Sequence, residues 1–391
     1  MLFLRFPVNF TLYPPFLMDF ETYRYTALRV REGKAAQLYE PTTSERMVFK
    51  YAPCWAVAVA PLGWLSDHAG GVLWSCFNVL WLLLTCWMSE RLCRLIGLHA
   101  PPFLAIVAVL SLVRPITSEY LLGQADLLWG VLLVAFLYCE AVARPWWAAL
   151  WLALAISLKL PALLWIPYLL LMRRAPVVLR TAAWLLALNV AAAWLLVPAA
   201  PLSLFAAWHH ALVTSGMTYA FDISNQSLMA LAGRLLRHDP YGLNLLVLPD
   251  RAVAFITVAI QALLFGALVF SRPTSTRRLV LDGALLMVFM VLFSPSAWLA
   301  TYSALLFPSA LTLALFFQQP RLLTRRFSVA LGAAGLLVFS ILMNAKFWHA
   351  LGIKAWKGES YVYLVFMIPT WLGLSLAWSL WHQRRALTYL T

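Results

Sequence analysis

Charged residues are scarce in this chain: only 11% of its 391 residues are Asp, Glu, Lys or Arg, whereas 63% are hydrophobic. A soluble domain usually carries about 25% charged and about 45–50% apolar residues. The mean hydropathy is +0.81, a value at which water would not solvate the folded surface. The solvent that fits is lipid, so we predict an all-α integral membrane protein that crosses the bilayer many times.

Several motifs are absent as well. The five cysteines form no CxxC pair and no metal-ligand spacing, so we expect neither a disulfide framework nor a zinc site. The sequence has no Walker motif, no dinucleotide-binding glycine fingerprint, no Gly-x-Ser-x-Gly and no His-Glu-x-x-His. We therefore expect no metal and no cofactor. No polar stretch is long enough for a soluble domain, and residues 1–391 are predicted to form a single polytopic membrane domain.

Apolar runs of about 20 residues predict membrane-spanning helices, and shorter runs predict broken or re-entrant helices. Ten or eleven such segments follow one another along the chain. The clear spans are 69–89, 125–142, 181–199, 252–270, 302–317, 327–343 and 361–381, and the shorter or interrupted segments are 52–66, 100–113, 145–172 and 282–293.

Positive charge exceeds negative charge, with 29 Lys and Arg against 15 Asp and Glu. In a soluble protein this balance would suggest nucleic acid. Here the basic residues gather in short loops, as they do on the cytoplasmic side of membrane proteins, so membrane lipids are the expected partners instead. The predicted cytoplasmic loops hold Arg173 and Arg174, Arg277 and Arg278, Arg325 and Arg326, and Arg384 and Arg385; the stretches 19–51, 200–251, 294–301 and 344–360 are predicted to lie outside.

The outer stretch 19–51 is rich in acidic and aromatic residues. Tyr23 and Ala27 fit one face of a helix that Gly33 would end. Asp19 stands where the chain should meet the membrane interface, and partial loss of water there would raise its basicity. Asp19 is therefore either a catalytic base or the N-cap of the following helix, since Asp is a favoured N-cap residue.

Lys159 is an ionisable residue inside the apolar segment 145–172, and such residues are costly in a membrane and usually functional. Pro161 breaks the helix beside it. The segment is either one span or a hairpin of two half-helices around Lys159. The lysine itself is a candidate cation for a lipid phosphate, or a side chain that extends to the interface.

A third polar group lies in the outer stretch 200–251. Asn225-Gln226-Ser227 precedes an apolar helix on which Arg234 and Arg237 are predicted to share one face. Arginine binds phosphate bidentately, which makes both residues candidate phosphate ligands. The alternative is a solvated helix at the membrane interface.

Taken in order, these residues resemble the motifs of glycosyltransferase family 87, membrane enzymes of the GT-C superfamily related to polyprenyl-phosphate-mannose-dependent α-mannosyltransferases. Each motif is short, and their order from about residue 19 to 305 carries the resemblance. The matching residues are Asp19-Phe20-x-x-Tyr23, Gly33, Leu38-Tyr39-Glu40-Pro41, Phe49-x-Tyr51-x-Pro53, Pro61-Leu62, Gly123-Gln124, Lys159-x-Pro161, Arg173-Arg174, Asn225-Gln226-Ser227-Leu228, Arg234 and Ser294-Pro295-x-x-Trp298.

The resemblance implies a GT-C-type fold and inverting transfer of a hexose, with mannose the first choice. The donor would be a polyprenyl-phosphate sugar and the acceptor a lipid or glycan, at the outer face of a bacterial inner membrane. No metal is implied. The implied site residues are Asp19 and, as second choice, Glu21 for the general base; Lys159, Arg234 and Arg237 for the donor phosphate; and Tyr23, Tyr51, Asn225 and Gln226 for substrate contacts.

Other interpretations stay open. A transporter or lipid flippase would use Lys159 at membrane depth between broken helices and would not need Asp19. A catalytically inactive relative could serve envelope assembly, and a polysaccharide polymerase or ligase would use diphosphate-linked donors. One departure from the family is the stretch 299–302, which has no histidine where members often carry one or two; a helper would then come from elsewhere, with His209, His210 and His349 as candidates.

Overall fold

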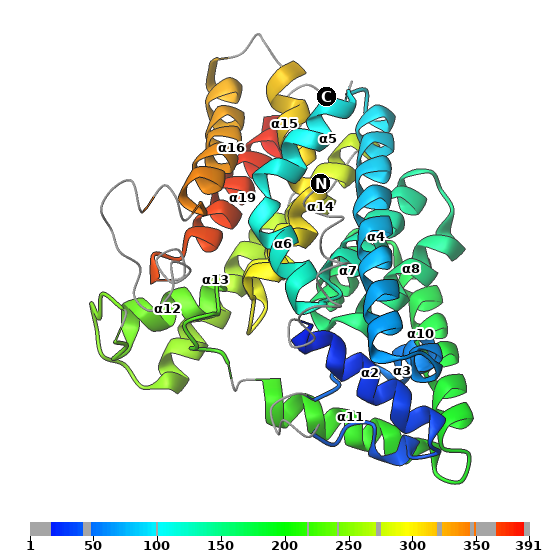
Figure 1. Cartoon of the computed structure of the whole chain (residues 1–391). Coiled ribbons are helices and arrows are strands. Elements are labelled where there is room, and N and C mark those ends of the chain that lie inside the picture. The colour runs from blue at the N-terminus through cyan, green and yellow to red at the C-terminus, as the bar shows by residue number, and fades with distance from the viewer. Residues whose placement is uncertain are drawn as a thin grey trace. The chain divides into compact units, whose positions relative to one another are not determined.

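The computed structural model describes residues 17–41, 48–98, 101–216, 219–240, 242–270, 275–318, 323–344, 348 and 365–386. Every regular element within these ranges is a helix, so the predicted all-α class is confirmed. Figure 1 shows these helices, coloured along the chain. The chain divides into two compact units. Unit 1 comprises Met1–Leu84, Thr117–Leu163 and Arg174–Thr218, and unit 2 comprises Thr85–Ile116, Leu164–Arg173 and Tyr219–Thr391.

Unit 1 is built around α7, α8 and α10, which pack side by side, with α2 against α3 and η3. Small residues allow the close packing of α8, whose Ala148, Ala149 and Ala153 are fully buried. The elements of unit 1 are α2 (Met18–Arg31), η2 (Ala35–Gln37), α3 (Pro53–Val59), η3 (Ala60–Trp64), the first part of α4 (Asp67–Leu95), the second part of α6 (Val113–Leu122), α7 (Asp126–Ala141), α8 (Pro145–Leu158), most of η4 (Leu160–Leu164), α10 (Ala175–Leu196) and α11 (Pro201–Gly216).

Unit 2 has its core in α14 and α15. Every residue from Val280 to Leu292 and from Leu306 to Leu315 is buried, because α19 packs on α14 and α16 while α5 packs on α15. The elements of unit 2 are the remainder of α4 and α6, α5 (Pro102–Ser111), α9 (Trp165–Leu171), α12 (Leu228–Leu236), α13 (Asp250–Val269), α14 (Thr276–Phe293), η5 (Leu299–Leu305), α15 (Leu306–Gln318), α16 (Leu323–Leu342) and α19 (Ile368–Ala386).

Several helices are long and apolar enough to cross a membrane. Among the described residues these are Asp67–Leu95, Ala175–Leu196, Asp250–Val269 and Leu299–Gln318, joined by a broken fifth in which Phe103–Ser111 and Val113–Leu122 meet at 68°. The other predicted segments that fall on described residues form shorter or partly polar helices. The multi-pass membrane class is thus confirmed, with fewer full-length spans than the ten or eleven apolar segments suggest.

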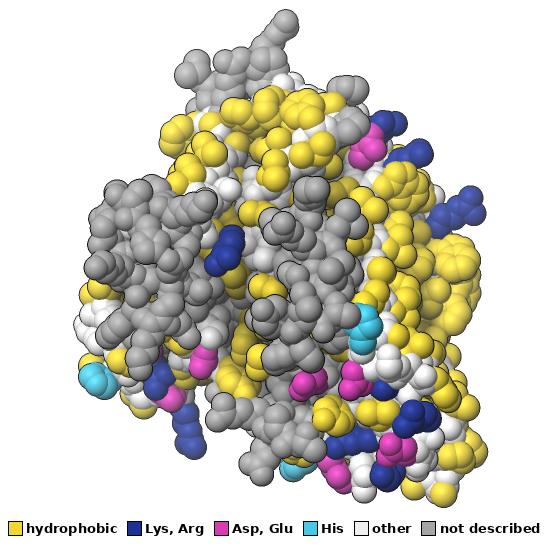
Figure 2. Space-filling model, viewed as in Figure 1, with side chains coloured by type: hydrophobic (Ala, Val, Ile, Leu, Met, Phe, Trp, Pro, Cys, Tyr) yellow, Lys and Arg dark blue, Asp and Glu magenta, His cyan; other side chains and the backbone are white. Residues whose placement is uncertain are grey.

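The exposed apolar side chains also indicate a membrane protein. Large apolar side chains are exposed along the spans, for example Leu83 on α4, Leu186 on α10 and Phe255 on α13. Figure 2 shows one group of charged side chains around α2 and others at the upper right and lower left of the view, whereas hydrophobic side chains cover much of the remaining visible surface that is not grey. A water-facing protein would not expose such helices, but lipid solvates them.

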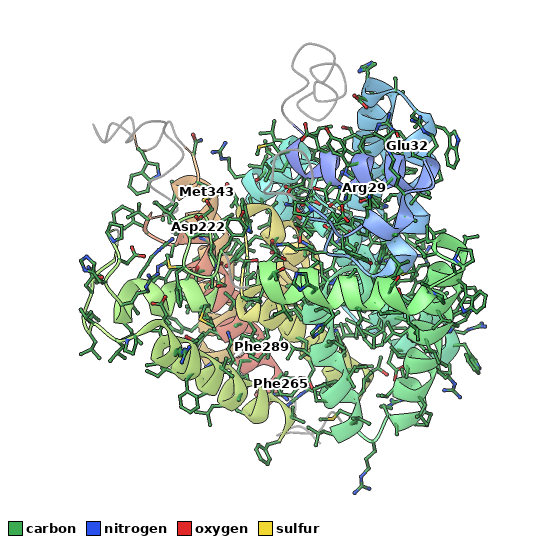
Figure 3. All side chains as sticks on the ribbon, turned by 90° about the horizontal axis from the view of Figure 1, so that it is seen from below. Arg29, Glu32, Asp222, Phe265, Phe289 and Met343 are labelled. Carbon is green, nitrogen blue, oxygen red and sulfur yellow. The ribbon has the colours of Figure 1, made fainter. Side chains whose placement is uncertain are left out.

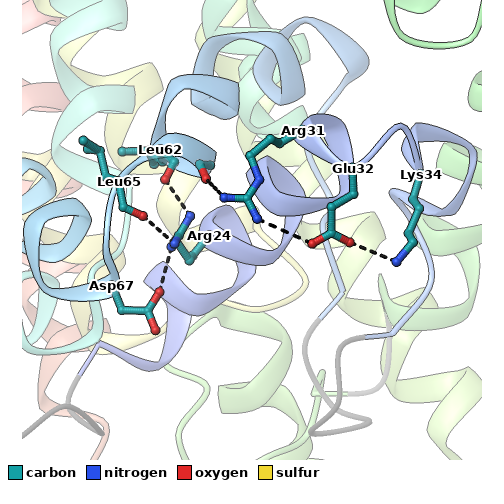
Figure 4. A network of polar contacts seen from close by, with 8 residues as sticks. Arg24, Arg31, Glu32, Lys34, Leu62, Leu65 and Asp67 are labelled. Carbon is teal, nitrogen blue, oxygen red and sulfur yellow. Dashed lines mark hydrogen bonds and ion pairs between the residues drawn. The ribbon is translucent and has the colours of Figure 1, made fainter.

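Helix α2 is fixed to its neighbours by arginine (Figure 4). The Arg24 guanidinium donates to the Leu62 carbonyl at 2.6 Å and to the Leu65 carbonyl at 2.5 Å, and its Nε lies 2.8 Å from Asp67. These carbonyls lie at the end of η3, where a helix leaves acceptors without helical partners. Arg24 therefore ties α2 to η3 and to the start of α4.

The far end of α2 is fixed in the same way. Arg31 donates to the Gly63 carbonyl at 2.7 Å, and a Cβ at Gly63 would lie only 2.6 Å from the Ala27 carbonyl oxygen, so α2 and η3 are in close contact. Arg29, labelled with Glu32 in Figure 3, donates to the carbonyl of Glu40 at 2.8 Å. The predicted helix end is confirmed: α2 stops at Arg31 and Gly33 has a φ of +71°.

Candidate functional site

Asp19 lies in the first turn of α2, and the N-cap is Leu17. The N-cap interpretation of Asp19 is therefore wrong, because the helix begins before it. The Asp19 Oδ2 accepts a hydrogen bond of 2.5 Å from Gln124 Nε2. Loss of water around the half-buried carboxylate raises the pKa of Asp19 to about 6, against the lowering effect of the Gln124 hydrogen bond. Glu21, the second choice for the base, is exposed.

A glycine turn brings Gln124 to Asp19. Gly123 has a φ of +70°, in the left-handed region that favours glycine. A Cβ at this position would lie 2.7 Å from the Phe20 Cβ, so the start of α2 can approach the turn only because no side chain is there. Trp74 Nε1 holds the turn by donating to the Gly123 carbonyl at 2.9 Å. The Gly123-Gln124 motif thus has a clear local role.

The turn continues into α7, where a second carboxylate is buried. Asp126 is 1% exposed, and its Oδ1 accepts a hydrogen bond of 2.5 Å from Lys159 Nζ. The Lys159 side chain is 20% exposed. A buried carboxylate without a cation would be strongly destabilising, so each residue of the pair accounts for the other.

Lys159 can reach Asp126 because α8 ends just before it. The helix stops at Leu158, and Lys159 has extended backbone angles, φ −144° and ψ 122°. The predicted break beside Pro161 is therefore confirmed. Glu119, also buried, accepts a hydrogen bond from the Leu127 N–H at 3.0 Å and thereby fixes the start of α7.

The segment before α3 contributes the Lys50 ammonium group and the Tyr51 hydroxyl to this cluster of unit 1. Burial lowers the pKa of Lys50, while attraction to Asp19 opposes this shift and repulsion from Lys159 adds to it. The Tyr23 and Tyr51 hydroxyls lie 2.8 Å apart. Tyr23 is buried, whereas Tyr51 is partly exposed. The carboxylate of Asp19 is thus electrostatically coupled to two lysines and to Asp126.

Unit 1 therefore brings together four of the predicted site residues, Asp19, Lys159, Tyr23 and Tyr51. The sequence pattern contains Gln124 only as part of a motif, and it does not single out Lys50, Glu119 or Asp126. A signal for Asp126 was available, because an acid at the start of an apolar segment is costly and Lys159 required a partner. Among the described residues, no group of three or more His, Cys, Asp and Glu side chains is arranged to hold a metal ion.

The Asn225-Gln226-Ser227 motif lies in unit 2 and joins the Ser294-Pro295 segment. Asn225 is 1% exposed, and its amide donates to the carbonyls of Ala220 at 2.7 Å and Pro295 at 2.8 Å. Its Oδ1 accepts a hydrogen bond from the Ala297 N–H at 2.9 Å. Ser227 is the N-cap of α12. Two of the family motifs thus contact each other through Asn225.

Gln226 completes this junction mainly through its backbone. Its N–H donates to the Ala297 carbonyl at 2.7 Å, and its carbonyl accepts from the hydroxyls of Tyr302 and Thr370, both at 2.6 Å. Tyr302, in the stretch that departs from the family, is fully buried in this role. These contacts favour a structural role for Asn225 and Gln226 over the predicted substrate contacts. His349 lies outside the described residues.

The two arginines do not share a helix face, contrary to prediction. Arg234 is 5% exposed on α12 and donates to the Ile223 carbonyl at 2.7 Å. The helix ends at Leu236, so Arg237 is extended beyond it, with its guanidinium 4.5 Å from the Phe221 ring centre and its Nε 3.2 Å from Asp250. Both guanidinium groups are engaged with the protein itself.

A second correction concerns two arginines predicted in cytoplasmic loops. Arg278 and Arg384 lie within α14 and α19 and are buried. Asp282 Oδ1 accepts from Arg278 Nε at 3.1 Å and from Arg384 Nε at 2.6 Å, and Oδ2 accepts from the Tyr168 hydroxyl at 2.9 Å. Sequence reasoning could not separate a basic loop from a buried ion pair at a helix end.

The fold and these contacts define a polytopic helical membrane protein with a cluster of carboxylates and lysines in unit 1. Comparison narrows the class: residues 49–295 match glycosyltransferase family 87, and the chain belongs to that family. The match includes Lys50, Gln124, Asp126 and Lys159 but begins after Asp19. The family prediction is thereby confirmed, and it supports sugar transfer over the transporter interpretation.

Among solved structures, the crystal structure of ArnT from Cupriavidus metallidurans bound to undecaprenyl phosphate is similar, with a TM-score of 0.38 and 13% identity. The likeness covers 94% of this chain and 74% of that chain. The search of curated proteins gave no match.

Proposed function

We propose that the protein transfers a hexose, with mannose the first choice, from a polyprenyl-phosphate donor to a hydroxyl of a lipid or glycan acceptor. The observation that carries this proposal is the cluster in unit 1. A carboxylate with a raised pKa, Asp19, is held by Gln124 in the same cluster as a cation, Lys159, that is held by Asp126. General base catalysis and stabilisation of a leaving phosphate need these two kinds of group.

In the proposed reaction Asp19 is the general base. Gln124 engages Oδ2, so we assign Oδ1 to the acceptor proton. As the acceptor oxygen attacks the anomeric carbon, its proton passes to Asp19 and the bond from that carbon to the donor phosphate oxygen breaks. The polyprenyl phosphate leaves with the electron pair, and attack from the opposite side inverts the anomeric centre. A pKa of about 6 keeps most of the base ionised at neutral pH.

The leaving phosphate requires positive charge. Lys159 is the first candidate, since its side chain is partly exposed while Asp126 holds the ammonium in place. Lys50 is the second, because it interacts electrostatically with both Asp19 and Lys159. Arg234 and Arg237 are less suited to this role, since their guanidinium groups contact carbonyls, Phe221 and Asp250.

The proposed partners are the polyprenyl-phosphate donor and the membrane lipids. The isoprenoid tail of the donor would lie among apolar helices, and membrane lipids would cover the exposed spans. Its place would be a bacterial inner membrane with the unit 1 cluster facing outside; the predicted outer position of 19–51 and the exposed Arg173 and Arg174 in a predicted cytoplasmic loop support this orientation. Partly exposed Tyr51 would contact substrate, supported by buried Tyr23.

The proposal is tested by transfer of label. Purified protein in lipid nanodiscs receives polyprenyl-phosphate mannose with a labelled sugar, together with total bacterial lipid and glycan as acceptors, and other polyprenyl-phosphate hexoses in parallel. The expected result is labelled acceptor with an inverted anomeric centre. Failure to transfer any of these hexoses would contradict the proposal. In sealed vesicles, movement of intact donor across the bilayer without transfer would support the flippase interpretation instead.

A further inference from the structure

The segment between α12 and α13 exposes a run of large apolar side chains. Leu243 is 75% exposed, Leu245 67% and Val247 69%, and Leu246 between them is 56% exposed. The stretch 242–249, Gly-Leu-Asn-Leu-Leu-Val-Leu-Pro, contains no charged residue. Apolar surface in water is unfavourable in proportion to its area, and a contiguous patch of this kind marks an interaction surface.

This segment, which we name the apolar loop (242–249), is held in a defined shape. Its backbone N–H groups at Asn244, Leu246 and Leu248 donate to successive carbonyls at the end of α12, with distances of 3.2, 3.3 and 2.8 Å. Asn244, whose φ is +49°, also exchanges two hydrogen bonds between its side-chain amide and the backbone of Asp239. The loop therefore cannot fold back to hide its leucines without breaking these contacts.

The loop lies at the level where a membrane span begins. Helix α13 has 20 residues from Asp250, a length of about 30 Å that matches the hydrocarbon core of a bilayer. Phe255 on this helix is 76% exposed, as a lipid-facing side chain would be. The ion pair between Arg237 and Asp250 places the end of α12 beside the start of α13. Leu246 is four residues from Asp250, at most about 14 Å along the chain.

We propose that the apolar loop inserts into the interfacial layer of the leaflet in which α13 begins, with lipid as its occupant. Its aliphatic side chains suit the acyl chains. Charged and polar groups next to it, at Arg237, His238, Asp250 and Arg251, suit the lipid headgroups. The exposed apolar side chains of the loop and Phe255 on α13 would then both contact lipid. Insertion would hold α12, and the Ser227 cap at its start, at a fixed depth. The inference is independent of the proposed sugar transfer.

Depth of a nitroxide spin label tests the proposal in the full-length protein reconstituted in liposomes. Labels are placed at Leu245 and Val247, at Phe255 as the lipid-facing control, and at exposed His238 as the control at headgroup level. Because the chain has five cysteines, labelling uses a Cys-free background. If that background does not fold, a genetically encoded ketone residue carries the label in the otherwise native chain. Power saturation compares collisions with oxygen, which concentrates in lipid, and with a water-soluble nickel chelate.

The expected result is a ratio of oxygen to nickel collisions at Leu245 and Val247 that is several-fold above His238 and shifted toward Phe255. A ratio at or below that of His238 would overturn the proposal, because the loop would then lie no deeper than the headgroups. Low accessibility to both oxygen and the nickel chelate would also overturn the proposal, because the loop would then be covered by protein and not by lipid. If spectral broadening then grows with protein density in the membrane, the occupant is a second copy of this chain.

Discussion

Both units bury ionisable groups among apolar helices, but the two clusters differ in how completely those groups are satisfied. In unit 2 both oxygens of Asp282 are engaged, by Arg278, Arg384 and Tyr168, and all four side chains are buried. In unit 1 the carboxylate of Asp19 is only partly covered. A sealed cluster whose carboxylate oxygens are both engaged can hold helices together but has no acceptor left for a substrate, whereas a partly exposed carboxylate with a raised pKa can exchange protons.

The Asn225-Gln226-Ser227 motif of unit 2 and the Gly123-Gln124 motif of unit 1 differ in the same way. Asn225 contributes both its amide and its carbonyl oxygen to hydrogen bonds that join two loops of unit 2. Gln124 contributes its amide to Asp19, the candidate base. We infer that the unit 2 motif holds the fold and that the unit 1 motif orients a reacting group.

The largest expected effect is on catalysis in unit 1. Replacing Asp19 with Asn removes the proposed base while its amide can still meet Gln124, so kcat should fall by roughly 10²–10⁴-fold with little change in folding. Transfer assays on purified variants measure this. Glu21→Gln is the matched control, since Glu21 is exposed on the same helix turn and should leave kcat near the native value. Turnover that survives in Asp19→Asn and is lost in Glu21→Gln would move the base.

The next effect is on stability in unit 2. Asp282→Ala leaves two buried guanidinium groups without their shared carboxylate, and breaking a buried pair in this way costs about 3–5 kcal/mol of unfolding free energy. Thermal unfolding in detergent, followed by circular dichroism, measures the loss. Asp67→Ala is the control, because Asp67 is 83% exposed in its pair with Arg24, and an exposed pair contributes about 0–1 kcal/mol. Equal stabilities of the two variants would contradict a structural role for the Asp282 cluster.

Lys159→Gln should weaken donor binding. A hydrogen bond to a charged group contributes about 1.5–3 kcal/mol, so the donor KM should rise by roughly 10–100-fold. The new amide can still donate to Asp126 but carries no charge, so the variant should also lose stability, and the donor KM is measured on the folded fraction. Kinetics at varied donor concentration measure the change. Lys34→Gln, at an exposed lysine of the same unit, serves as the control. An unchanged donor KM would remove Lys159 from the phosphate site.

A smaller effect is expected at the glycine turn. Gly123→Ala places a Cβ against Phe20 at a φ of +70°, which costs about 1–3 kcal/mol and displaces Gln124 from Asp19. Gly97→Ala is matched for backbone strain, since Gly97 has a φ of +76° but no heavy atom within 4 Å of the added Cβ. Both variants should lose stability, and only Gly123→Ala should lose activity per folded molecule. Equal activities would show that the turn does not orient the site.

Local features were readable from the sequence. The apolar runs gave the helices, Gly33 gave the end of α2, and Pro161 gave the break at Lys159. Local reasoning failed where a distant partner decides the structure. The helix pattern of α12 continues through Arg237, but the helix stops at Leu236, and Asp250 and Phe221 hold the arginine outside it.

The site itself was only half readable, for the same reason. Asp19 and Lys159 could be singled out because each is a charge in an apolar setting. Asp126 also stands out as an acid at the start of an apolar segment, but the pairings could not be predicted, since Gln124 is 105 residues from Asp19 and Asp126 is 33 residues from Lys159. Pairing at such separations depends on how α2, α7 and α8 pack together, and a single sequence does not encode that packing in any local pattern.

The pH dependence of kcat/KM for native protein and Asp126→Asn tests the unit 1 cluster most directly. Asp19 acts as a base only when ionised, so the native rate should fall as the pH drops through about 6 and level off above it. The negative charge of Asp126 helps to raise the pKa of Asp19, so its removal should move the midpoint to lower pH. A native rate without a fall near pH 6, or a midpoint that Asp126→Asn leaves in place, would contradict the account.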